Sequence, residues 1–292
     1  MTPERRRYQL GLALVLFAVI SWSTAGYFSR LIHVDSWTMQ FWRAVFGAVT
    51  SLLAIAVMQR GRPARAFMRL GRGTWLYALV SGLGMTSFLA ALSLTSVAHV
   101  AIVYAALPFV AAIMAAFALG ERAGPGTLFA SLIAFAGVGI AAVGGAGEGH
   151  WTGDLMAVAM TLLMGVMIVL ARRYPGTPMV PAAFLSTIVA GVIALPFATL
   201  WPLDARSLLL LALFGATNTA LGLILFATGS KLIPATESAL LSSLEAPLAP
   251  FWVWLAFGET PLPLTIAGGA LVMAAVLGHL LIGARLAPVP AE

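Results

Sequence analysis

Two stretches of the chain share one design: AHVAIVYAALPFVAAIMAAFALGE at Ala98–Glu121 and TESALLSSLEAPLAPFWVWLAFGE at Thr236–Glu259. A shift of 138 positions aligns them, and the polar residue near the start of the first, His99, then falls on Glu237. Each copy is long enough for one helix, carries a proline near its middle and ends in Gly-Glu. Self-similarity at a fixed spacing indicates an internal repeat. We therefore expect two halves built around these copies.

The composition excludes a water-soluble protein. Hydrophobic residues make up 61% of the chain and charged residues 9%, and the mean hydropathy is +1.00. Soluble domains carry about 25% charged residues, so this chain has too few to cover a surface that faces water. We expect an integral membrane protein whose surroundings are the lipid bilayer. The sequence has no cysteine, so neither disulfide bonds nor thiol chemistry is available.

Ten stretches are apolar over the roughly 20 residues that a membrane-spanning helix needs. They cover residues 9–29, 36–58, 74–95, 98–119, 125–145, 151–172, 180–201, 207–231, 235–257 and 262–284. Their pattern lacks the period of two that is typical of β-barrel strands. Because backbone groups in lipid must be hydrogen-bonded internally, we predict an all-α polytopic membrane protein with ten transmembrane helices.

The basic residues indicate the orientation of the chain. With the N-terminus inside, only Arg30 and Arg206 lie in loops on the outer side. The inner side receives Arg5, Arg6, Arg7, Arg60, Arg62, Arg65, Arg69, Arg72, Arg122, Arg172, Arg173, Lys231 and Arg285. This asymmetry satisfies the positive-inside rule. We expect a multi-pass protein of the inner (plasma) membrane with both termini cytoplasmic, and we attribute the net charge of +6 to orientation rather than to nucleic-acid binding.

The repeat divides the chain into residues 1–147 and 148–292, each with five predicted spans. Gly144–Gly149, GGAGEG, is interpreted as the linker between them, because no GxxxxGK[ST] nucleotide-binding motif occurs in the sequence. Five is an odd number, so the second half enters the membrane from the opposite side. Inverted-topology repeats of this kind are typical of transporters that alternate access to a site near the midplane. We predict two inverted five-helix repeats around a central cavity.

The chain resembles, over essentially its whole length, the ten-helix members of the drug/metabolite transporter superfamily of the EamA type. The resemblance rests on the paired Pro…Leu-Gly-Glu and Glu-Ala-Pro…Phe-Gly-Glu helices, on Arg43 in the second span and on Ser-Trp-Ser-Thr at Ser21–Thr24. Within the superfamily, the chain is most similar to bacterial aromatic amino acid exporters. Members commonly have Glu directly before Pro in the ninth span, whereas Ala246 here separates Glu245 from Pro247.

Glu245 is the first candidate for a substrate or proton site. It lies ten residues into the ninth span, about 15 Å deep at the rise of an α-helix. Because a charge inside a membrane is costly to bury, an acid at this depth is a functional hypothesis by default. Glu245 is either a proton site, a partner for the amino group of a substrate, or a structural acid paired with Arg43. The resemblance implies that a Glu here is a family feature.

Arg43 lies seven residues past Ser36, about 10 Å below the outer face. Its planar guanidinium suits a substrate carboxylate. The alternative is structural, with the side chain extending toward the surface or pairing with an acid.

His99 and Glu237 open the two repeat copies at opposite faces of the membrane. His99 is a candidate gate or proton site, because histidine titrates near physiological pH. Glu237 at a helix N-terminus is explained by the helix dipole alone. A metal site is not expected, because the four histidines form no close pair and cysteine is absent.

Aromatic and small polar side chains inside the spans complete the set of predicted cavity residues, namely Trp22, Thr24, Trp42, Phe88, Tyr104, Asn218 and Trp252. An apolar cavity with a few polar groups suits amino acid side chains. Packing within the core or against lipid is the alternative for each of them. Trp254 is excluded if Trp252 lines the cavity, because the two point to different faces of their helix.

These observations lead to a transporter hypothesis. The architecture comes from the sequence, and the resemblance implies export of small metabolites, including aromatic amino acids, by alternating access. A lipid or lipid-linked flippase on the same scaffold is an alternative, whereas an intramembrane enzyme is disfavoured because no GxSxG or HExxH motif occurs. No cofactor is expected. One chain holds both halves, so a monomer suffices and a homodimer is not required. Proton coupling and facilitated transport both remain open.

Overall fold

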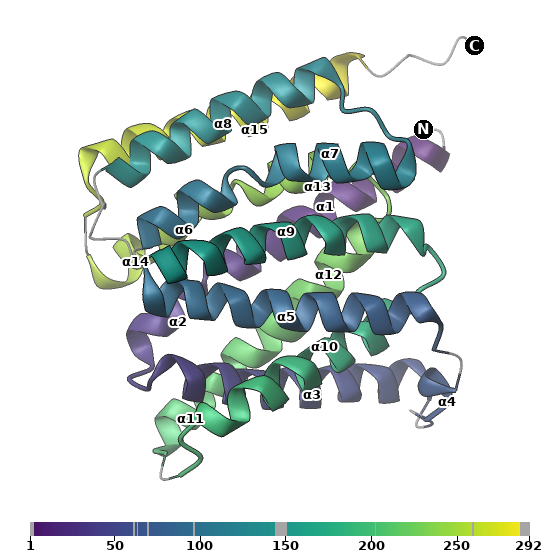
Figure 1. The fold of residues 1–292 in the computed structure, drawn as a ribbon, viewed down its shortest axis with the longest axis vertical. Coiled ribbons are helices and arrows are strands. Elements are labelled where there is room, and N and C mark those ends of the chain that lie inside the picture. The colour runs from purple at the N-terminus through teal and green to yellow at the C-terminus, as the bar shows by residue number, and fades with distance from the viewer. Residues whose placement is uncertain are drawn as a thin grey trace.

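The computed structural model describes residues 3–60, 62, 64–68, 70–95, 97–143, 151–201, 203–258 and 260–286, with the backbone alone for 97–98 and 283–286. In this part of the chain, ten helical segments are long and apolar enough to cross a membrane. They lie side by side in a single bundle (Figure 1). The prediction of an all-α protein with ten spans is confirmed.

The first half contains eight helices that form five spans. They are α1 (Pro3–Ser23), α2 (Ala25–Leu31), α3 (Ser36–Met58), α4 (Ala64–Phe67), α5 (Arg72–Leu94), α6 (Val97–Tyr104), α7 (Leu107–Leu119) and α8 (Pro125–Val143). The first span consists of α1 and α2, the fourth consists of α6 and α7, and α4 is a short helix in the loop between the second and third spans.

The second half forms the other five spans. Its elements are α9 (Trp151–Arg173), α10 (Met179–Ala194), η1 (Leu195–Phe197), α11 (Ala205–Phe214), η2 (Gly215–Leu221), α12 (Gly222–Gly229), α13 (Ala235–Ser242), α14 (Glu245–Phe257) and α15 (Pro263–Leu286). A π-helical turn, η2, joins α11 to α12 within the eighth span, and α13 and α14 together make the ninth.

The internal repeat is visible in the bounds of the broken spans. Both bounds of α6 plus 138 give those of α13, and both bounds of α7 plus 138 give those of α14. Gly120 and Gly258, at the ends of the two copies, share the same left-handed backbone conformation with φ 69°. Glycine adopts this conformation without the steric cost that a Cβ would impose, which explains the Gly-Glu endings.

The two halves run through the bundle in opposite directions. α1 and α9 open the halves, and they begin at opposite ends of the bundle (Figure 1). We call the end where α1 begins the basic face, because it carries Arg65, Arg172, Arg173 and Lys231. The other end is the opposite face. The contacts between helices respect the same symmetry, because α3 packs on α10, α7 on α13 and α8 on α15, each pairing equivalent spans of the two halves.

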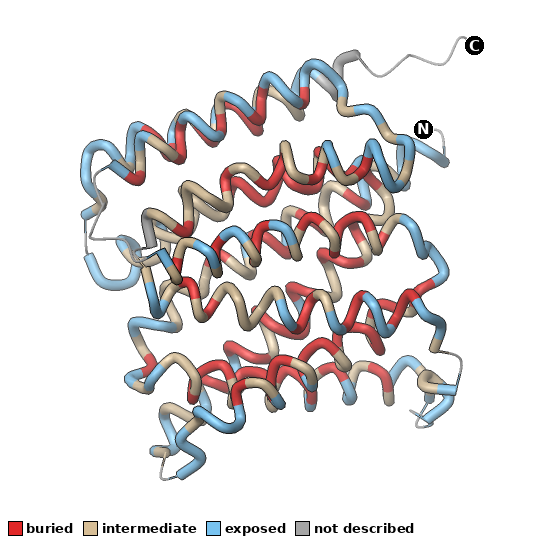
Figure 2. Tube along the Cα trace, viewed as in Figure 1, coloured by how far each residue is buried: buried red, intermediate tan, exposed pale blue. Residues whose placement is uncertain are grey.

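Close contact of α8 with α15 depends on small residues. A Cβ added to Gly268 would lie 2.3 Å from the carbonyl oxygen of Gly137 and 2.6 Å from the backbone nitrogen of Ala141. Gly137 and Ala141 allow the two helices to approach this closely because they carry little or no side chain. Buried positions lie along the sides of the helices that face the middle of the bundle (Figure 2).

Three features predicted from the sequence need comment. The boundary between residues 1–147 and 148–292, together with the linker Gly144–Gly149, lies outside the described residues, as does Glu259. Pro108 and Pro247, the prolines near the middle of the two repeat copies, lie in the first turns of α7 and α14, next to the breaks in the fourth and ninth spans. Pro250 does not end its helix, because α14 continues through it to Phe257.

Candidate functional site

The breaks in the fourth and ninth spans expose helix ends inside the bundle. The first break lies between Tyr104 and Leu107, and the second between Ser242 and Glu245. Interrupted helices leave backbone groups without helical partners, which is why transporters bind substrates and ions at such places. The two breaks occupy equivalent positions in the repeat, so the inverted halves bring two irregular segments to one level of the bundle.

Glu245 lies at the second break, as the first residue of α14. Its side chain is half-buried, and among the described residues no hydrogen bond or ion pair to it is found. Tyr104 from the first break lies close enough to Glu245 to interact with its charge, and it contacts Ser242. The last residue of α6 therefore faces the last residue of α13 and the first residue of α14. An acid at this level requires a partner, either a proton or a cationic group.

Phe88 joins this region through Tyr104. Both are partly buried and pack on a small cluster with Val100 and Met160. Tyr104 also packs on the main core of the bundle. Phe88 and Tyr104 thus share one cluster of α5 and α6, and Tyr104 faces Glu245 of α14.

Trp252 lies on the same side of α14 as Glu245, because seven residues make about two helical turns. Its indole Nε1 donates a hydrogen bond of 2.8 Å to Oγ of Ser23, which is fully buried at the end of α1. Thr24 follows at the break between α1 and α2, and its hydroxyl donates to the carbonyl of Ser21 at 2.6 Å. Trp254 is 46% exposed, which agrees with the expectation that the two tryptophans face different ways.

Trp22 and Asn218 form a pair between α1 and the π-helical turn η2. The Trp22 indole donates to the Asn218 carbonyl at 3.0 Å, and the Asn218 amide donates to the carbonyls of Ser21 and Trp22 at 2.9 and 3.1 Å. Trp22 also packs on Phe226, with 4.8 Å between ring centroids. These contacts join the two halves. The sequence did not reveal the π-helical turn, although such turns are frequent at functional sites.

Trp42 and Arg43 form a separate group. The Arg43 guanidinium is buried, donates to the side-chain oxygen of Gln40 at 2.5 Å and lies 5.0 Å from the ring centroid of Phe214. Trp42 packs in the same small core, and its indole nitrogen is buried without a hydrogen-bond partner among the described residues. The alternative interpretation, in which Arg43 neutralises Glu245, is not seen in the described part of the chain.

His99 lies near the opposite face, as the third residue of α6. Its Nδ1 is 3.1 Å from Oδ1 of Asp154 at the start of α9, and the hydroxyl of Thr95 donates to the same oxygen at 2.9 Å. The side chains of His99 and Asp154 are 33% and 38% exposed. This group connects the first half to the second within reach of solvent. Sequence reasoning identified His99 but missed Asp154.

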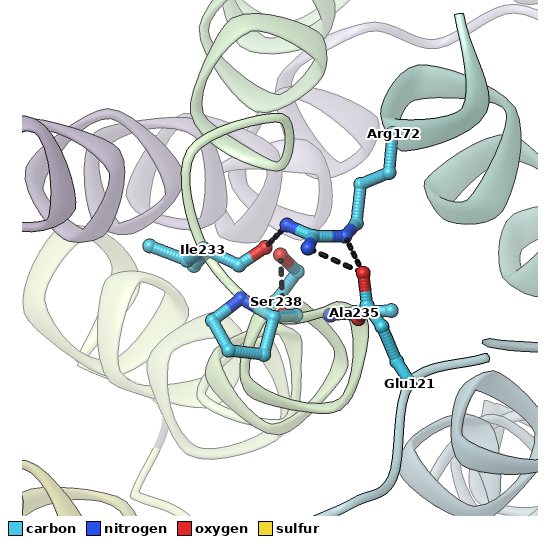
Figure 3. A network of polar contacts seen from close by, with 6 residues as sticks. Glu121, Arg172, Ile233, Ala235 and Ser238 are labelled. Atoms are coloured by element: carbon cyan, nitrogen blue, oxygen red, sulfur yellow. Dashed lines mark hydrogen bonds and ion pairs between the residues drawn. The ribbon is translucent and has the colours of Figure 1, made fainter. Parts of the chain in front are cut away.

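A network at the basic face fixes the start of α13 (Figure 3). Arg172, near the end of α9, donates from Nε to Glu121 at 2.6 Å, forms an ion pair with it and also donates to the carbonyl of Ile233. The other oxygen of Glu121 accepts from the backbone N–H of Ala235 at 3.5 Å. We call Glu121, Arg172, Ile233 and Ala235 the basic-face network. Its sequence signal was the Gly-Glu ending of the first repeat copy.

Lys231 fixes the neighbouring loops at the same face. Its ammonium group donates to the carbonyls of Pro175 and Thr177 at 2.9 and 2.6 Å. Burial lowers the pKa of Lys231 below its ordinary value. Two hollows open nearby, one of about 360 Å³ between α3, α4 and α10 and one of about 520 Å³ between α5 and the loop after α9. Neither contains any of the predicted cavity residues.

The comparisons with known proteins can now be set beside this geometry. The chain matches the EamA-like transporter family over residues 9–143 and again over 151–281. It belongs to this family. The two matches agree with the two five-helix repeats seen in the structure, and membership of the drug/metabolite transporter superfamily follows. As an EamA-like protein, the chain is a multi-pass membrane transporter and not an enzyme.

Distant relatives cover nearly the whole chain. An S-adenosylmethionine uptake transporter of Rickettsia bellii (strain RML369-C) is 22% identical over 284 residues, which is 95% of each protein. An uncharacterized transporter of Archaeoglobus fulgidus is 25% identical over 274 residues, 93% of this chain and 97% of that protein. A crystal structure with 20% identity superposes with a TM-score of 0.79 over 95% of this chain and 99% of its own. This last likeness shows the fold alone.

Proposed function

We propose that this EamA-like transporter exports small metabolites, among them amino acids and aromatic amino acids in particular, by alternating access around Glu245. The observation that carries the proposal is a half-buried carboxylate at a helix break, without a protein partner among the described residues and beside the aromatic side chain of Tyr104. A substrate ammonium group would neutralise Glu245 and so offset the free-energy cost of burying a carboxylate at this depth.

The aromatic side chains favour an apolar substrate group. Tyr104 approaches Glu245 from the first half, Phe88 packs in the same small cluster as Tyr104, and Trp252 lies on the same side of α14 as Glu245. Tyr104 and Trp252 offer flat surfaces on which an aromatic ring can stack, at a gain of about 0.5–1.5 kcal/mol per pair beyond the area that is buried. Trp22, Thr24 and Asn218 shape the wall behind Trp252, because Trp252 is hydrogen-bonded to Ser23.

We assign Arg43 and Trp42 a supporting role in substrate binding. Gln40 and Phe214, which contact the Arg43 guanidinium, are both uncharged, so a substrate carboxylate would find an unneutralised cation there. An amino acid carries an ammonium group suited to Glu245 and a carboxylate suited to Arg43, which belong to separate groups of the site. S-adenosylmethionine, the substrate named for the relative in Rickettsia bellii, also carries an α-amino acid group.

We infer the orientation of the chain in the membrane from its basic residues. The positive-inside rule places the basic face in the cytoplasm, and both termini with it. Since one chain contains both repeats, a monomer provides the complete pathway. Proteins that share this scaffold include an importer by name, so direction in cells depends on gradients as well as on architecture.

Counterflow into proteoliposomes tests the proposal. Vesicles loaded with unlabelled tryptophan are diluted into labelled tryptophan, phenylalanine, alanine or S-adenosylmethionine at the same pH on both sides. We expect saturable accumulation of the aromatic amino acids, which Glu245→Gln reduces. Folded protein that accumulates none of these solutes would contradict the proposal, and flipping of a fluorescent phospholipid by the same vesicles would then favour the flippase alternative.

A further inference from the structure

A second polar group lies at the basic face, away from Glu245. Glu237, the third residue of α13, accepts a hydrogen bond of 2.6 Å at Oε2 from the hydroxyl of Tyr8 on α1. Its other oxygen, Oε1, is 3.9 Å from Nε2 of His279 on α15. The same nitrogen of His279 is 3.5 Å from the hydroxyl of Thr127 on α8. We call Tyr8, Thr127, Glu237 and His279 the Tyr8 cluster.

The Tyr8 cluster is more than a capped helix end. The side chains of Glu237 and His279 are each only 16% exposed, and Thr127 is buried. The helix dipole alone was expected to explain Glu237, but a dipole requires neither a tyrosine nor a histidine from another helix. Four helices supply these side chains, and histidine is the side-chain type that ordinarily serves as a proton switch in proteins.

The contacts of the Tyr8 cluster divide in a way that matters for transport. The Tyr8–Glu237 and Thr127–His279 contacts join the first half to the second, whereas the Glu237–His279 contact lies within the second half. A proton on His279 creates an imidazolium that draws the charge of the Glu237 carboxylate toward itself. The bond from Tyr8 is strong because its acceptor is charged. Protonation therefore favours the contact within one half at the expense of the contact between halves.

Among the described residues, few other ionisable groups lie near the Tyr8 cluster. Arg172 and Glu121 lie at the start of α13 and neutralise each other, and Glu245 lies eight residues beyond Glu237 on α14. α8 contributes only the hydroxyl of Thr127. The start of α1 carries exposed charges at Glu4, Arg5, Arg6 and Arg7.

We propose that the Tyr8 cluster is the proton-binding site through which this transporter couples transport to protons. One proton from the water at the basic face binds between His279 and Glu237, weakens the Tyr8–Glu237 bond and opens the basic face. Release of that proton restores the bond and closes the face. The same proton on Nε2 of His279 also stops that nitrogen from accepting from the Thr127 hydroxyl, so the second contact between the halves changes with the first. The inference rests on the proposed alternating access of the same chain.

The experiment measures opening without any substrate. The chain has no cysteine, so Ser238→Cys introduces a single thiol, at a position that is fully buried beside Glu237. Its rate of modification by a methanethiosulfonate reagent is measured between about pH 8 and about pH 5.5, which brackets the titration of histidine. Each rate is divided by that of the same protein unfolded in detergent at the same pH. Exposed His33, changed to Gln, is the matched histidine control.

We expect the normalised rate to rise by about fivefold or more as the pH falls, the lower end of typical coupling factors. Glu237→Gln should fix the rate at the high value at every pH, His279→Gln at the low value, and His33→Gln should retain the parental profile. A rate that does not change with pH, or a profile that survives both Glu237→Gln and His279→Gln, would overturn the proposal. Counterflow at equal pH reports the proposed function separately, so failure of one experiment does not imply failure of the other.

Discussion

α13 and α6 occupy equivalent positions in the two repeats, yet only α13 is packed on all sides. Every residue of α13 except Glu237 is buried. In the described side chains of α6, only Val100 is buried, and the others are half-exposed. Among the segments of the broken spans, α7 and α13 lie toward the basic face and contain buried residues. α14 lies toward the opposite face and has none. In these broken spans, the segments toward the basic face are thus more deeply buried than those toward the opposite face.

This difference has a chemical basis. The α13 sequence, ATESALLS, consists mostly of small residues that allow close approach, and the basic-face network fixes its first turn. The α6 sequence, VAHVAIVY, has larger side chains, and its described residues make polar contacts from His99 to Asp154 and from Tyr104 to Ser242. In an inverted repeat, the two ends exchange roles when access alternates. The comparison predicts that contacts at the basic face, rather than those at the opposite face, hold the present state.

The largest effect is expected where the two breaks differ most, at Glu245 and its equivalent Leu107. Glu245→Gln removes the only acid found at either break and should lower counterflow of tryptophan by about a hundredfold, because a charged hydrogen bond is worth about 1.5–3 kcal/mol. Glu245→Leu, which makes the second break like the first, should lower it at least as far. Both variants should elute as folded protein. Parental transport by either variant would show that the difference between the breaks is structural only.

The second prediction concerns the basic-face network. Arg172→Gln should leave Glu121 without its charged partner and open the basic face, raising modification of Ser238→Cys by about thirtyfold, as expected for about 2 kcal/mol lost from charged hydrogen bonds. Arg173→Gln is the matched control, since Arg173 is the exposed neighbour on the same helix. The idea fails if the two variants are modified at the same rate.

A smaller effect is expected from changing Trp252 in the second half or Trp22 in the first half. Trp252→Phe retains an aromatic ring but removes the hydrogen bond to Ser23, which is worth about 1 kcal/mol, or about fivefold. Trp22→Ala removes the ring that packs on Phe226. Both changes should alter the ratio of tryptophan to alanine counterflow. An unchanged ratio in both variants would identify the two residues as packing residues.

The repeat, the ten spans and the level of Glu245 were predictable because they depend on apolar length and on spacing along the chain. The bounds of α13 and α14 follow from those of α6 and α7 by one shift. The side-chain contacts of the site were harder to predict from the sequence. Asp154 and Tyr8 come from helices that pack on α6 and α13, and one sequence gives no pairing between distant helices. The environment of Arg43, with Gln40 and Phe214, depended on the same unknown packing.

The smallest effect is expected from changing Asp35, which caps α3 at the opposite face. Asp35 caps α3 by accepting from the backbone N–H groups of Trp37 and Thr38, both at 3.0 Å, and from the Thr38 hydroxyl. Thr38 in turn accepts from the backbone N–H of Thr199 at 2.7 Å, so this cap supports a contact between the halves. Burial raises the pKa of Asp35, but the hydrogen bonds outweigh it and the pKa is lowered.

A lowered pKa in the folded protein means that the carboxylate contributes stability above its unfolded pKa, and that this contribution is lost as the pH falls through the folded pKa. Asp35→Ala should therefore destabilise the protein by about 1 kcal/mol at neutral pH, as is usual for a lost cap, and by less below about pH 4. Asp35→Asn, which can still cap, should lose little. Thermal unfolding in detergent at several pH values measures both. Because Asp35 supports contacts at the opposite face, neither variant should change modification of Ser238→Cys at the basic face, and a change there would show that the two faces are not held independently.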